Sequence, residues 1–469
     1  MKITAPRIQS FILILALLQQ AMGCALYRPA PRAVEKDLFP KAYSKGSNPW
    51  QPATRWWLEF NDPQLNALVD EALQHNFTLQ QSWARLRQVQ ALAVESGADL
   101  YPELSLGAGA SVERYKTNIT DTVESYSIGI SAGYEIDLWG RIRSGRQAAL
   151  LEAAASREDL NAAAITLSAT VASRWIGIIS QRLQKQLLEQ QLAANLTMLE
   201  LVELRFRKSL ASALDVFQQR QVVAQTRAQI PLVEQTERQL MNELAVLLGR
   251  VPLDLPAIRS RSLQMPSGVP PAGLPVQLLT ARPDIRASLQ RLEAADWYTA
   301  AARAARLPDL NLSATAAYQA DEVSRIFDNW LVNLAGSLTA PLLDGHRRQA
   351  EVDRMRAVTA ENLAAYRLTI LQAIQEVEDA LISEEKLGEH IRGLQAQRTA
   401  ARNALDEARS RYRKGLNDYL PVLTQLLTVQ ALERTEIQRR AELLIARVNL
   451  YRSLGGTWPR ELSSPEGLP

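Results

Sequence analysis

One stretch of twelve residues occurs twice in the chain and decides its architecture. The first copy reads Arg205-Phe206-Arg207-Lys208-Ser209-Leu210-Ala211-Ser212-Ala213-Leu214-Asp215-Val216. The second copy, 206 positions later, reads Arg411-Tyr412-Arg413-Lys414-Gly415-Leu416-Asn417-Asp418-Tyr419-Leu420-Pro421-Val422. The same offset aligns Pro102-Glu103-Leu104 with Pro308-Asp309-Leu310, and Leu248-Gly249 with Leu454-Gly455. A register kept over most of a half-chain indicates an internal duplication, so two copies of one unit build the fold.

The composition argues against several classes of function. The 53 basic residues nearly balance the 50 acidic ones, whereas a nucleic-acid surface shows a concentrated basic excess. A single cysteine excludes a disulfide framework, and three histidines leave little for a metal site. Gly140 and Gly145 have the outer spacing of a phosphate loop, but Arg146-Gln147 replace its Lys and Ser/Thr. We therefore expect no enzymatic activity, no cofactor, no metal and no nucleic-acid partner.

The N-terminus predicts export. Lys2 and Arg7 precede the short apolar run 11–18, and small residues then lead to Cys24. This pattern is typical of a signal peptide, here residues 1–23, whose apolar run is too short to span a bilayer. No other run of eighteen apolar residues occurs, so no transmembrane helix is expected after cleavage.

The only cysteine stands directly after the predicted cleavage point. This position predicts Cys24 as a lipid attachment site at the start of an extended, lipidated leader, residues 24–55. The alternative is ordinary cleavage that leaves Cys24 as an incidental thiol.

Repeat 1 is predicted over residues 56–250. Asp62 before Pro63 is a helix start, with the aspartate as N-cap and the proline in the first turn. Apolar and small polar residues then alternate with period two, which predicts two strands over about 103–137 joined by the polar stretch 114–125.

A long helix follows each strand pair. Without an interrupting proline, the first is predicted from about Gly145 to Leu210, and at 1.5 Å per residue it is on the order of 100 Å long. It reverses at a tip, about 205–216, into a second helix. The remaining predicted segments are a Pro-rich crossover at 251–276, repeat 2 at 277–458 with strands at about 309–341 and a tip at about 411–422, and a tail at 459–469.

Four strands cannot close a barrel by themselves. In lipid every backbone polar group must be bonded within protein, and single-chain membrane barrels start at eight strands. If the strands enter a membrane, several chains must pool them. A soluble sheet is the alternative, but small residues on the polar face and aromatics near the strand ends favour membrane insertion; the aromatics are Tyr126, Tyr134, Tyr318 and Trp330.

The chain resembles the TolC-like outer-membrane efflux factors, in particular the lipoprotein branch that serves resistance–nodulation–division pumps. The resemblance covers Trp56 to Trp458, and its most specific strings are Tyr134-Glu135-Ile136-Asp137-Leu138-Trp139-Gly140-Arg141 and Arg282-Pro283-Asp284-Ile285. It implies an α+β membrane protein and a homotrimer in the outer membrane. Four strands per chain then form a twelve-stranded barrel, which continues into a periplasmic helical barrel with an equatorial domain.

The resemblance also implies a passive conduit for drugs, metals or metabolites. Its partners are a periplasmic adaptor protein and an inner-membrane pump, and its surroundings are outer-membrane lipid. Two alternatives stay open: the outer conduit of a type I protein secretion system, and a periplasmic scaffold lipoprotein without a channel.

By resemblance, the two repeated turns are the periplasmic tips, where the tunnel is gated. The gate candidates are Asp418, Asp215, Tyr419 and Tyr412. Many family members carry an aspartate and an alanine where this chain has Thr424-Gln425, and a solvated turn aspartate is the alternative role of Asp418.

The tips also carry the candidates for closing the tunnel or docking the adaptor. These are Arg205, Arg207, Lys208, Leu210, Arg411, Arg413, Lys414 and Gly415. The alternative for the basic residues is helix capping, because cations at a helix C-terminus complement the helix dipole. Phe206 stands where the second copy has Tyr412, so a bond from that hydroxyl is not symmetric.

Overall fold

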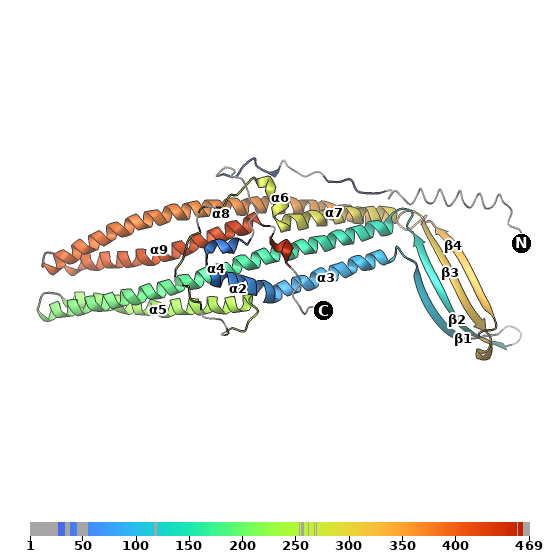
Figure 1. Cartoon of the computed structure of the whole chain (residues 1–469), viewed down its shortest axis with the longest axis horizontal. Coiled ribbons are helices and arrows are strands. Elements are labelled where there is room, and N and C mark those ends of the chain that lie inside the picture. The colour runs from blue at the N-terminus through green and yellow to red at the C-terminus, as the bar shows by residue number, and fades with distance from the viewer. Residues whose placement is uncertain are drawn as a thin grey trace. The chain divides into compact units, whose positions relative to one another are not determined.

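The structure is a computed structural model, and it describes residues 27–32, 38–44, 55–116, 120–252, 254, 258–260, 262–266, 268, 270–456 and 458–462. The predicted signal peptide and Cys24 lie outside these residues. In chain order the main elements are η2 Trp56–Phe60, α2 Pro63–His75, α3 Phe77–Ala98, β1 Glu103–Lys116, β2 Thr120–Ile136, α4 Arg141–Arg207, α5 Ala213–Leu247, η3 Pro275–Gln277, α6 Leu278–Ala281, α7 Pro283–Ala304, β3 Asp309–Ala320, η4 Val323–Arg325, β4 Trp330–Thr339, α8 Arg347–Arg413, α9 Tyr419–Leu454 and η5 Trp458–Glu461 (Figure 1).

The helix boundaries repeat the duplication seen in the sequence. α7 begins and ends 206 positions after α3, and α8 does the same relative to α4. α4 and α8 each have 67 residues, so each is on the order of 100 Å long. The two long helices and their return helices confirm the predicted pair of hairpins.

Local capping explains where the first helices begin. The Asp62 carboxylate accepts hydrogen bonds from the backbone N–H groups of Gln64 and Leu65, at 2.8 and 3.0 Å, as the N-cap prediction requires. Buried Asn76 separates α2 from α3 because its side-chain oxygen accepts from the N–H of Leu79 at 3.0 Å. The asparagine therefore ends one helix and caps the next.

Among the described residues, one helix, α4, is long and apolar enough to cross a membrane by length and composition. Of the eighteen-residue window that meets this test, 61% is buried within the protein. Mostly buried core helices of soluble proteins pass the same test, so this window is weak evidence for a span.

The four strands form one antiparallel sheet in the order β1-β2-β3-β4, with β1 and β4 at its edges (Figure 1). The register places apolar residues in one row across the sheet and polar residues in the next. These rows are Leu106, Ile130, Ala316 and Val332, and Ser105, Ser131, Thr315 and Asn333. Because alternate residues point to opposite faces, the sheet has one apolar and one polar face.

The prediction of a polar connection from 114 to 125 is wrong. β1 runs on to Lys116 and β2 begins at Thr120, so most of this stretch belongs to the strands. Residues 114 and 122 are partners in the ladder. The reason is that hairpin pairing is made by backbone groups, which do not require apolar side chains.

The described chain divides into two compact units. Unit 1 contains the sheet with residues 85–158 and 286–369, and unit 2 contains residues 35–84, 159–285 and 370–469. In unit 1, the indole N–H of Trp139 donates to the carbonyl of Pro308 at 2.7 Å, and Arg141 pairs with Glu135 at 2.6 Å. The specific string at 134–141 therefore joins the end of β2 to the start of α4.

In unit 2, each helical hairpin ends at a glycine that lies against the end of another helix. Gly249 follows α5 and contacts the end of α2, and Gly455 follows α9 and contacts the end of α6. Gly249 and Gly455 both have positive φ, +72° and +77°. A Cβ on Gly249 would lie 2.4 Å from the carbonyl oxygen of His75, and one on Gly455 would lie 2.6 Å from that of Ala281. Only glycine fits this backbone conformation and close approach.

Candidate functional site

The two hairpin tips turn in the same way, through backbone bonds alone. After α4, Ser209 takes the left-handed conformation with φ of +58°, and the N–H of Leu210 donates to the carbonyl of Arg205 at 2.8 Å. After α8, Gly415 stands in the same place with φ of +75°, and the equivalent bond measures 2.9 Å. These are Schellman motifs, which satisfy the last carbonyls of a helix. The turn itself thus needs none of the charged tip side chains.

The helices after the two turns begin differently. Ser212 and Asp215 form a reciprocal capping box at the start of α5, in which Asp215 accepts from the N–H of Ser212 at 2.9 Å. Asp418 is the N-cap of α9 but makes no side-chain cap bond. Its carboxylate is exposed, and no ion pair engages it among the described residues. Of the two candidate carboxylates, Asp215 has a capping role and Asp418 remains available.

Three tip side chains contact one another across the two hairpins. The guanidinium of Arg205, on α4, lies 4.4 Å from the ring centre of Tyr412, on α8. The ring of Tyr412 lies 5.5 Å from that of Tyr419, on α9, at an angle of 54°. A cation over an aromatic face is attracted by the ring quadrupole, and this attraction strengthens when water is excluded. The stack therefore joins the tip of one hairpin to the tip of the other.

Both tyrosines are buried, which raises the pKa of each phenol above its usual value. The hydroxyl of Tyr419 donates to the side-chain oxygen of Gln219 at 2.5 Å. By contrast, the hydroxyl of Tyr412 has no hydrogen-bond partner within the described part of the chain. The two phenols thus differ in what their hydroxyls contribute.

A buried polar chain continues from Tyr419 into the helices. Gln219, on α5, donates to the backbone carbonyl of Asn195, on α4, at 2.7 Å. The amide of Asn195 donates to the hydroxyl of Thr226 at 3.0 Å, and Gln430, on α9, donates to the side-chain oxygen of Asn195 at 2.8 Å. All four are buried, so each lost bond leaves a polar group without water. We call Gln191, Asn195, Gln219, Thr226, Tyr419 and Gln430 the polar ladder.

The next contacts join the ladder to two half-buried charges, Glu433 and Arg434. Gln191 donates to the backbone carbonyl of Gln430 at 3.2 Å and to Glu433 at 3.1 Å. Arg434 donates to the side-chain oxygen of Gln191 at 2.7 Å. Helices α4, α5 and α9 are thereby tied by side chains along several turns below the tips.

The sequence analysis missed the polar ladder. A signal was present, because Gln191 and Asn195 lie four residues apart on the same stripe as buried Leu188 and Val202. Asn195 has no counterpart in the second copy, where Ala401 stands 206 positions later. The repeat comparison that found the tips therefore passed over it.

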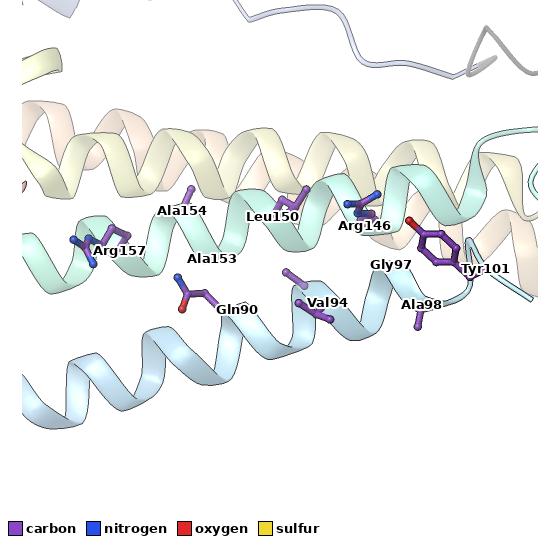
Figure 2. Close-up of a pocket in the computed structure, with 11 residues that line it drawn as sticks. Gln90, Val94, Gly97, Ala98, Tyr101, Arg146, Leu150, Ala153, Ala154 and Arg157 are labelled. Carbon is purple, nitrogen blue, oxygen red and sulfur yellow. The ribbon is translucent and has the colours of Figure 1, made fainter. Parts of the chain in front are cut away.

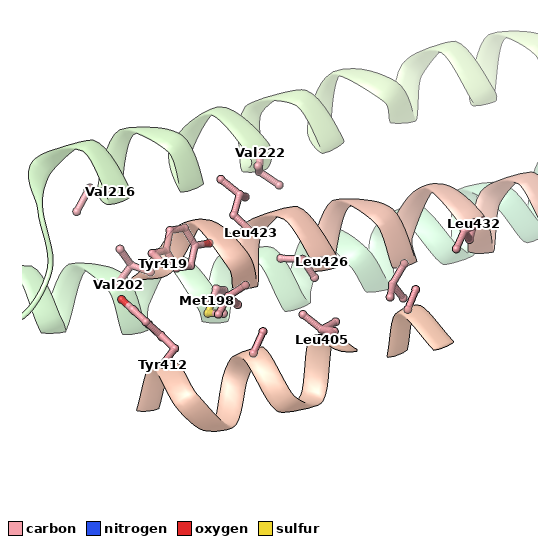
Figure 3. Packing of buried hydrophobic residues seen from close by; sticks show 14 of the residues in the cluster. Met198, Val202, Val216, Val222, Leu405, Tyr412, Tyr419, Leu423, Leu426 and Leu432 are labelled. Atoms are coloured by element: carbon pink, nitrogen blue, oxygen red, sulfur yellow. The ribbon is translucent and has the colours of Figure 1, made fainter. Parts of the chain in front are cut away.

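A cluster of buried apolar side chains packs with the two tyrosines (Figure 3). Figure 3 shows Tyr412 of α8 directed toward Val202 of α4, with Tyr419 of α9 beside them. The buried cluster consists of Met198, Val202, Val216, Val222, Leu394, Ala401, Leu405, Ala408, Tyr412, Tyr419, Val422, Leu423, Leu426, Val429 and Leu432. Four helices contribute to it, so the hairpins share one core at this end.

The predicted basic residues of the tips have different environments. Arg411 pairs with Glu407 one turn earlier in α8, at 2.7 Å, whereas its counterpart Arg205 stacks on Tyr412. The other four cations are exposed, and no ion pair of theirs is found in the described ranges: Arg207, Lys208, Arg413 and Lys414. The charge is therefore presented outward at both tips.

Exposed leucines lie beside these cations at equivalent positions of the two tips. Leu210 is 63% exposed and its counterpart Leu416 is 69% exposed. Leu214 and Leu420, another pair at the 206-residue offset, are also exposed. Large apolar side chains at an exposed, basic turn are typical of an interaction surface.

A hollow of about 550 Å³ lies between α3 and α4 in unit 1 (Figure 2). Small side chains line it, including Ala93, Gly97 and Ala153, and Arg146 and Arg157 border it. Figure 2 shows both arginines extending from α4 beside the hollow. A groove between helices that is lined mainly by small and apolar side chains suits the packing of another helix.

Across the residues with described positions, no group of three or more His, Cys, Asp or Glu side chains is arranged to hold a metal ion. The tips instead offer a carboxylate, exposed leucines and cations, and a buried polar connection between hairpins.

Comparison with known proteins identifies the class. The family described as outer membrane efflux protein matches residues 68–250 and 274–456. The two matches are themselves 206 positions apart. The chain belongs to the outer membrane efflux protein family.

Individual relatives agree with this assignment. The pyoverdine export outer membrane protein OpmQ of Pseudomonas aeruginosa is 36% identical over 417 residues, which cover 86% of this chain and 87% of the relative. The outer membrane protein OprJ of the same species is 30% identical over 462 residues, covering 95% of each chain. The solved outer-membrane channel OprN superposes with a TM-score of 0.88 at 28% identity, covering 93% of this chain and 100% of that one.

These findings confirm the predicted family, fold class and location. The chain is an outer-membrane component of an efflux system, with a duplicated fold of long helices and a four-stranded antiparallel sheet.

Proposed function

We propose that the chain forms a homotrimeric, passive conduit of a tripartite efflux system. Three sheets pool their strands into a closed barrel in the outer membrane, and the long helices line a tunnel in the periplasm. An inner-membrane pump, of the resistance–nodulation–division type, delivers the cargo through a periplasmic adaptor. The conduit needs no cofactor and no catalytic step.

One observation carries this proposal, namely a sheet with an apolar and a polar face and with two free edges, β1 and β4. A sheet in lipid must have its edges paired, and copies of the same chain supply matching edges. Once closed, the apolar face contacts lipid and the polar face lines the lumen. The hollow between α3 and α4 gives a neighbouring chain's helix a place to pack below the sheet.

The cargo class follows from the relatives. The names of two of them refer to pyoverdine and to toluene, which are small molecules. Small-molecule efflux is therefore the favoured role, ahead of protein secretion or a scaffold. We further propose that Cys24 carries the lipid anchor of the mature chain, because it is the only cysteine.

The hairpin tips are the proposed gate and adaptor-docking surface. Leu210, Leu416 and their basic neighbours are exposed and available to an adaptor. The carboxylate of Asp418 is exposed and makes no capping hydrogen bond. Three copies around the threefold axis would therefore place three carboxylates near the tunnel end. A ring of carboxylates favours the passage of cations. Opening requires a partner that binds the open arrangement more tightly than the closed one.

Single-channel conductance in planar bilayers tests the proposal. Purified wild type should form pores that prefer cations, and Asp418→Ala should reduce that preference. Asn417→Ala, one residue away and neutral, is the matched control and should keep wild-type selectivity. Pores with equal selectivity in all three proteins would retain the conduit and remove Asp418 from the gate. Detergent-stable protein that never forms pores, even after removal of the tips, would contradict the conduit.

A further inference from the structure

The two halves of the sheet pair in the same register. The β1–β2 ladder ends where Glu103 lies opposite Gly133, and the β3–β4 ladder ends 206 positions later, where Asp309 lies opposite Thr339. Every pair of the β3–β4 ladder is the counterpart of a β1–β2 pair in this way. The duplication therefore fixes the strand pairing as well as the helix boundaries, so a pairing made by one repeat predicts the pairing of the other.

β2 extends three residues beyond the point at which its counterpart stops. Residues 134–136 of β2 pair with β3 alone, because the β1–β2 ladder ends just before them. The counterpart of Ile136 is Leu342, but β4 ends at Thr339. Because β4 is an edge strand, no described strand lies beside residues 340–342 in the place that β3 takes beside the end of β2.

The end of β4 leaves apolar side chains without cover. Leu342 is 90% exposed, and Leu343 after it is exposed as well. At the other edge of the sheet, Leu104 of β1 is also exposed. Continued in strand conformation, residues 340–342 would place Leu342 on the apolar face with Leu338. Both edges therefore carry exposed leucines at the end of the sheet from which the helices continue.

The backbone of β4 points to the free edge at its even-numbered residues. The N–H of Gln319, in β3, donates to the carbonyl of Asn329, just before β4, at 3.2 Å. In an antiparallel ladder, residues bonded to one neighbour alternate with residues that point to the other side, so the odd residues of β4 face β3. Ala340 and Leu342 then face outward. Pro341, which has no N–H, falls on the side of β3, where the ladder has already ended, and removes no donor from the free edge.

The β2–β3 ladder shows which strand fits this edge. Its eleven pairs end with Ile136 opposite Leu310. One repeat further on, the same ladder joins β4 to a β1 strand and ends with Leu342 opposite Leu104. β1 already contains all eleven residues that this ladder needs, whereas β4 lacks residues 340–342. A sheet of four strands is too small to bring its own β1 to its own β4, so a second copy of the chain supplies the strand.

The side chains are compatible with this register. Arg114 is the one charged member of the apolar-face pairs, and it lies at the end far from Leu342. On the polar face Glu113 lies opposite Asn333, so no like charges are opposed. A slip of one residue would set Leu342 against Ser105 and mix the two faces along the ladder. The apolar-face pairs are Val332 with Arg114, Leu334 with Val112, Gly336 with Ala110, Leu338 with Ala108, Ala340 with Leu106, and Leu342 with Leu104.

We propose that residues 340–342 join β4 only when a second copy of the chain pairs its β1 with that edge. Ala340 and Leu342 then form backbone hydrogen bonds with Leu106 and Leu104 of the next copy, and the leucines at the end of the ladder pack side by side. The inference rests on the proposed assembly of copies but not on the gate, the adaptor or the cargo. It adds to that assembly a fixed register and a segment that becomes a strand on association.

Cysteine cross-linking of the detergent-purified full chain tests the register. Leu342→Cys with Leu104→Cys should form a disulfide between copies, because the Cα atoms of opposed residues lie about 5.5 Å apart and a disulfide spans about 4.4–6.8 Å. Leu342→Cys with Leu106→Cys is the matched control, two positions away on the same face, at about 7–8 Å. The first double variant should run as a covalent trimer on denaturing, non-reducing gels. The control, the single variants and the wild type, which has Cys24 alone, should lose this product.

Amide hydrogen exchange in the assembled protein tests the added strand segment. The N–H groups of Ala340 and Leu342 should exchange at least about tenfold more slowly than that of Leu343, which lies outside the ladder. Equal, fast exchange at all three residues would overturn the extension of β4.

The cross-links separate this inference from the proposed conduit. A covalent product from the Leu106 pair in place of the Leu104 pair would overturn the register. A trimer that forms pores but gives neither cross-link would overturn the inference and leave the conduit standing. Wild type that remains a single chain in outer membranes and in detergent would contradict the conduit, and this inference with it.

Discussion

Replacing Tyr419 with Phe removes one hydroxyl from the polar ladder and changes little else. The hydroxyl donates to Gln219 at 2.5 Å, and both residues are at most 1% exposed. The side-chain oxygen of Gln219 then loses its partner in a place that water does not reach. An unsatisfied buried acceptor costs about 1–3 kcal/mol.

The lost hydrogen bond destabilises the closed state relative to the open state if opening separates the two hairpins. The ladder and the Arg205 stack join α4 and α5 to α8 and α9, so an opening that parts them breaks the Tyr419 bond in the wild type. The variant has already lost that bond in the closed state. Its open population should therefore rise by roughly 5–150-fold, which corresponds to about 1–3 kcal/mol.

Open probability in planar bilayers is the assay, and Tyr412→Phe is the control. Tyr412 is equally aromatic, is 3% exposed and touches Tyr419, but its hydroxyl has no partner in the described residues. Its loss should change open probability by less than about twofold. A double-mutant cycle of Tyr419→Phe with Gln219→Leu should give a coupling energy of about 0.5–3 kcal/mol. Equal open probabilities for wild type and both tyrosine variants would refute the reasoning.

Three further predictions concern stability. Gly455→Ala adds a methyl group 2.6 Å from a carbonyl oxygen of α6, at a residue whose φ is positive. It should lower the thermal midpoint clearly more than Gly415→Ala, a control with similar φ and open space around it, which should cost about 1–2 kcal/mol. Equal effects of the two substitutions would contradict the close approach. Glu384→Leu leaves the buried guanidinium of Arg447 without the carboxylate that it contacts at 3.0 Å. The free energy of unfolding should fall by about 3–5 kcal/mol, and adding Arg447→Met should recover most of this loss. Burial and the nearby Glu59 carboxylate raise the pKa of Tyr451 in the folded state. The contribution of Tyr451 to stability is therefore fully present below about pH 10 and is lost as the pH rises further. The phenolate absorbance of this residue should appear together with unfolding, and titration of every tyrosine before unfolding would contradict the prediction.

The duplication made the fold predictable from the sequence. Period-two alternation predicted the strands, and long uninterrupted helical periodicity predicted α4 and α8. The extent of β1 and β2 was not predictable in the same way, because the outer part of the hairpin carries polar residues that follow no alternation of hydrophobicity. Backbone pairing, which the side chains do not reveal, sets that limit.

The sequence predicted which residues form the tips but not how their side chains contact one another. The repeated stretch drew attention to the tips, and Tyr419 lies in their buried core. The capping role of Asp215 depends on its hydrogen bonds with Ser212. The second copy lacks this pair of residues, so comparing the two copies could not predict the role. Asn195 was missed because a lone polar residue on a buried stripe resembles a surface position until its neighbours are known.

The two free edges of the sheet have a consequence for how the protein is made. Before chains assemble, the outer edges of β1 and β4 have no strand to pair with, although each strand is paired on its inner side. Unpaired edges invite association with any extended chain nearby. In the proposed trimer, assembly therefore depends on concentration, because pairing with two further copies of the chain competes with pairing to unrelated extended chains. Factors that hold nascent chains apart during transit should therefore determine the yield of this protein more strongly than the stability of its helices does.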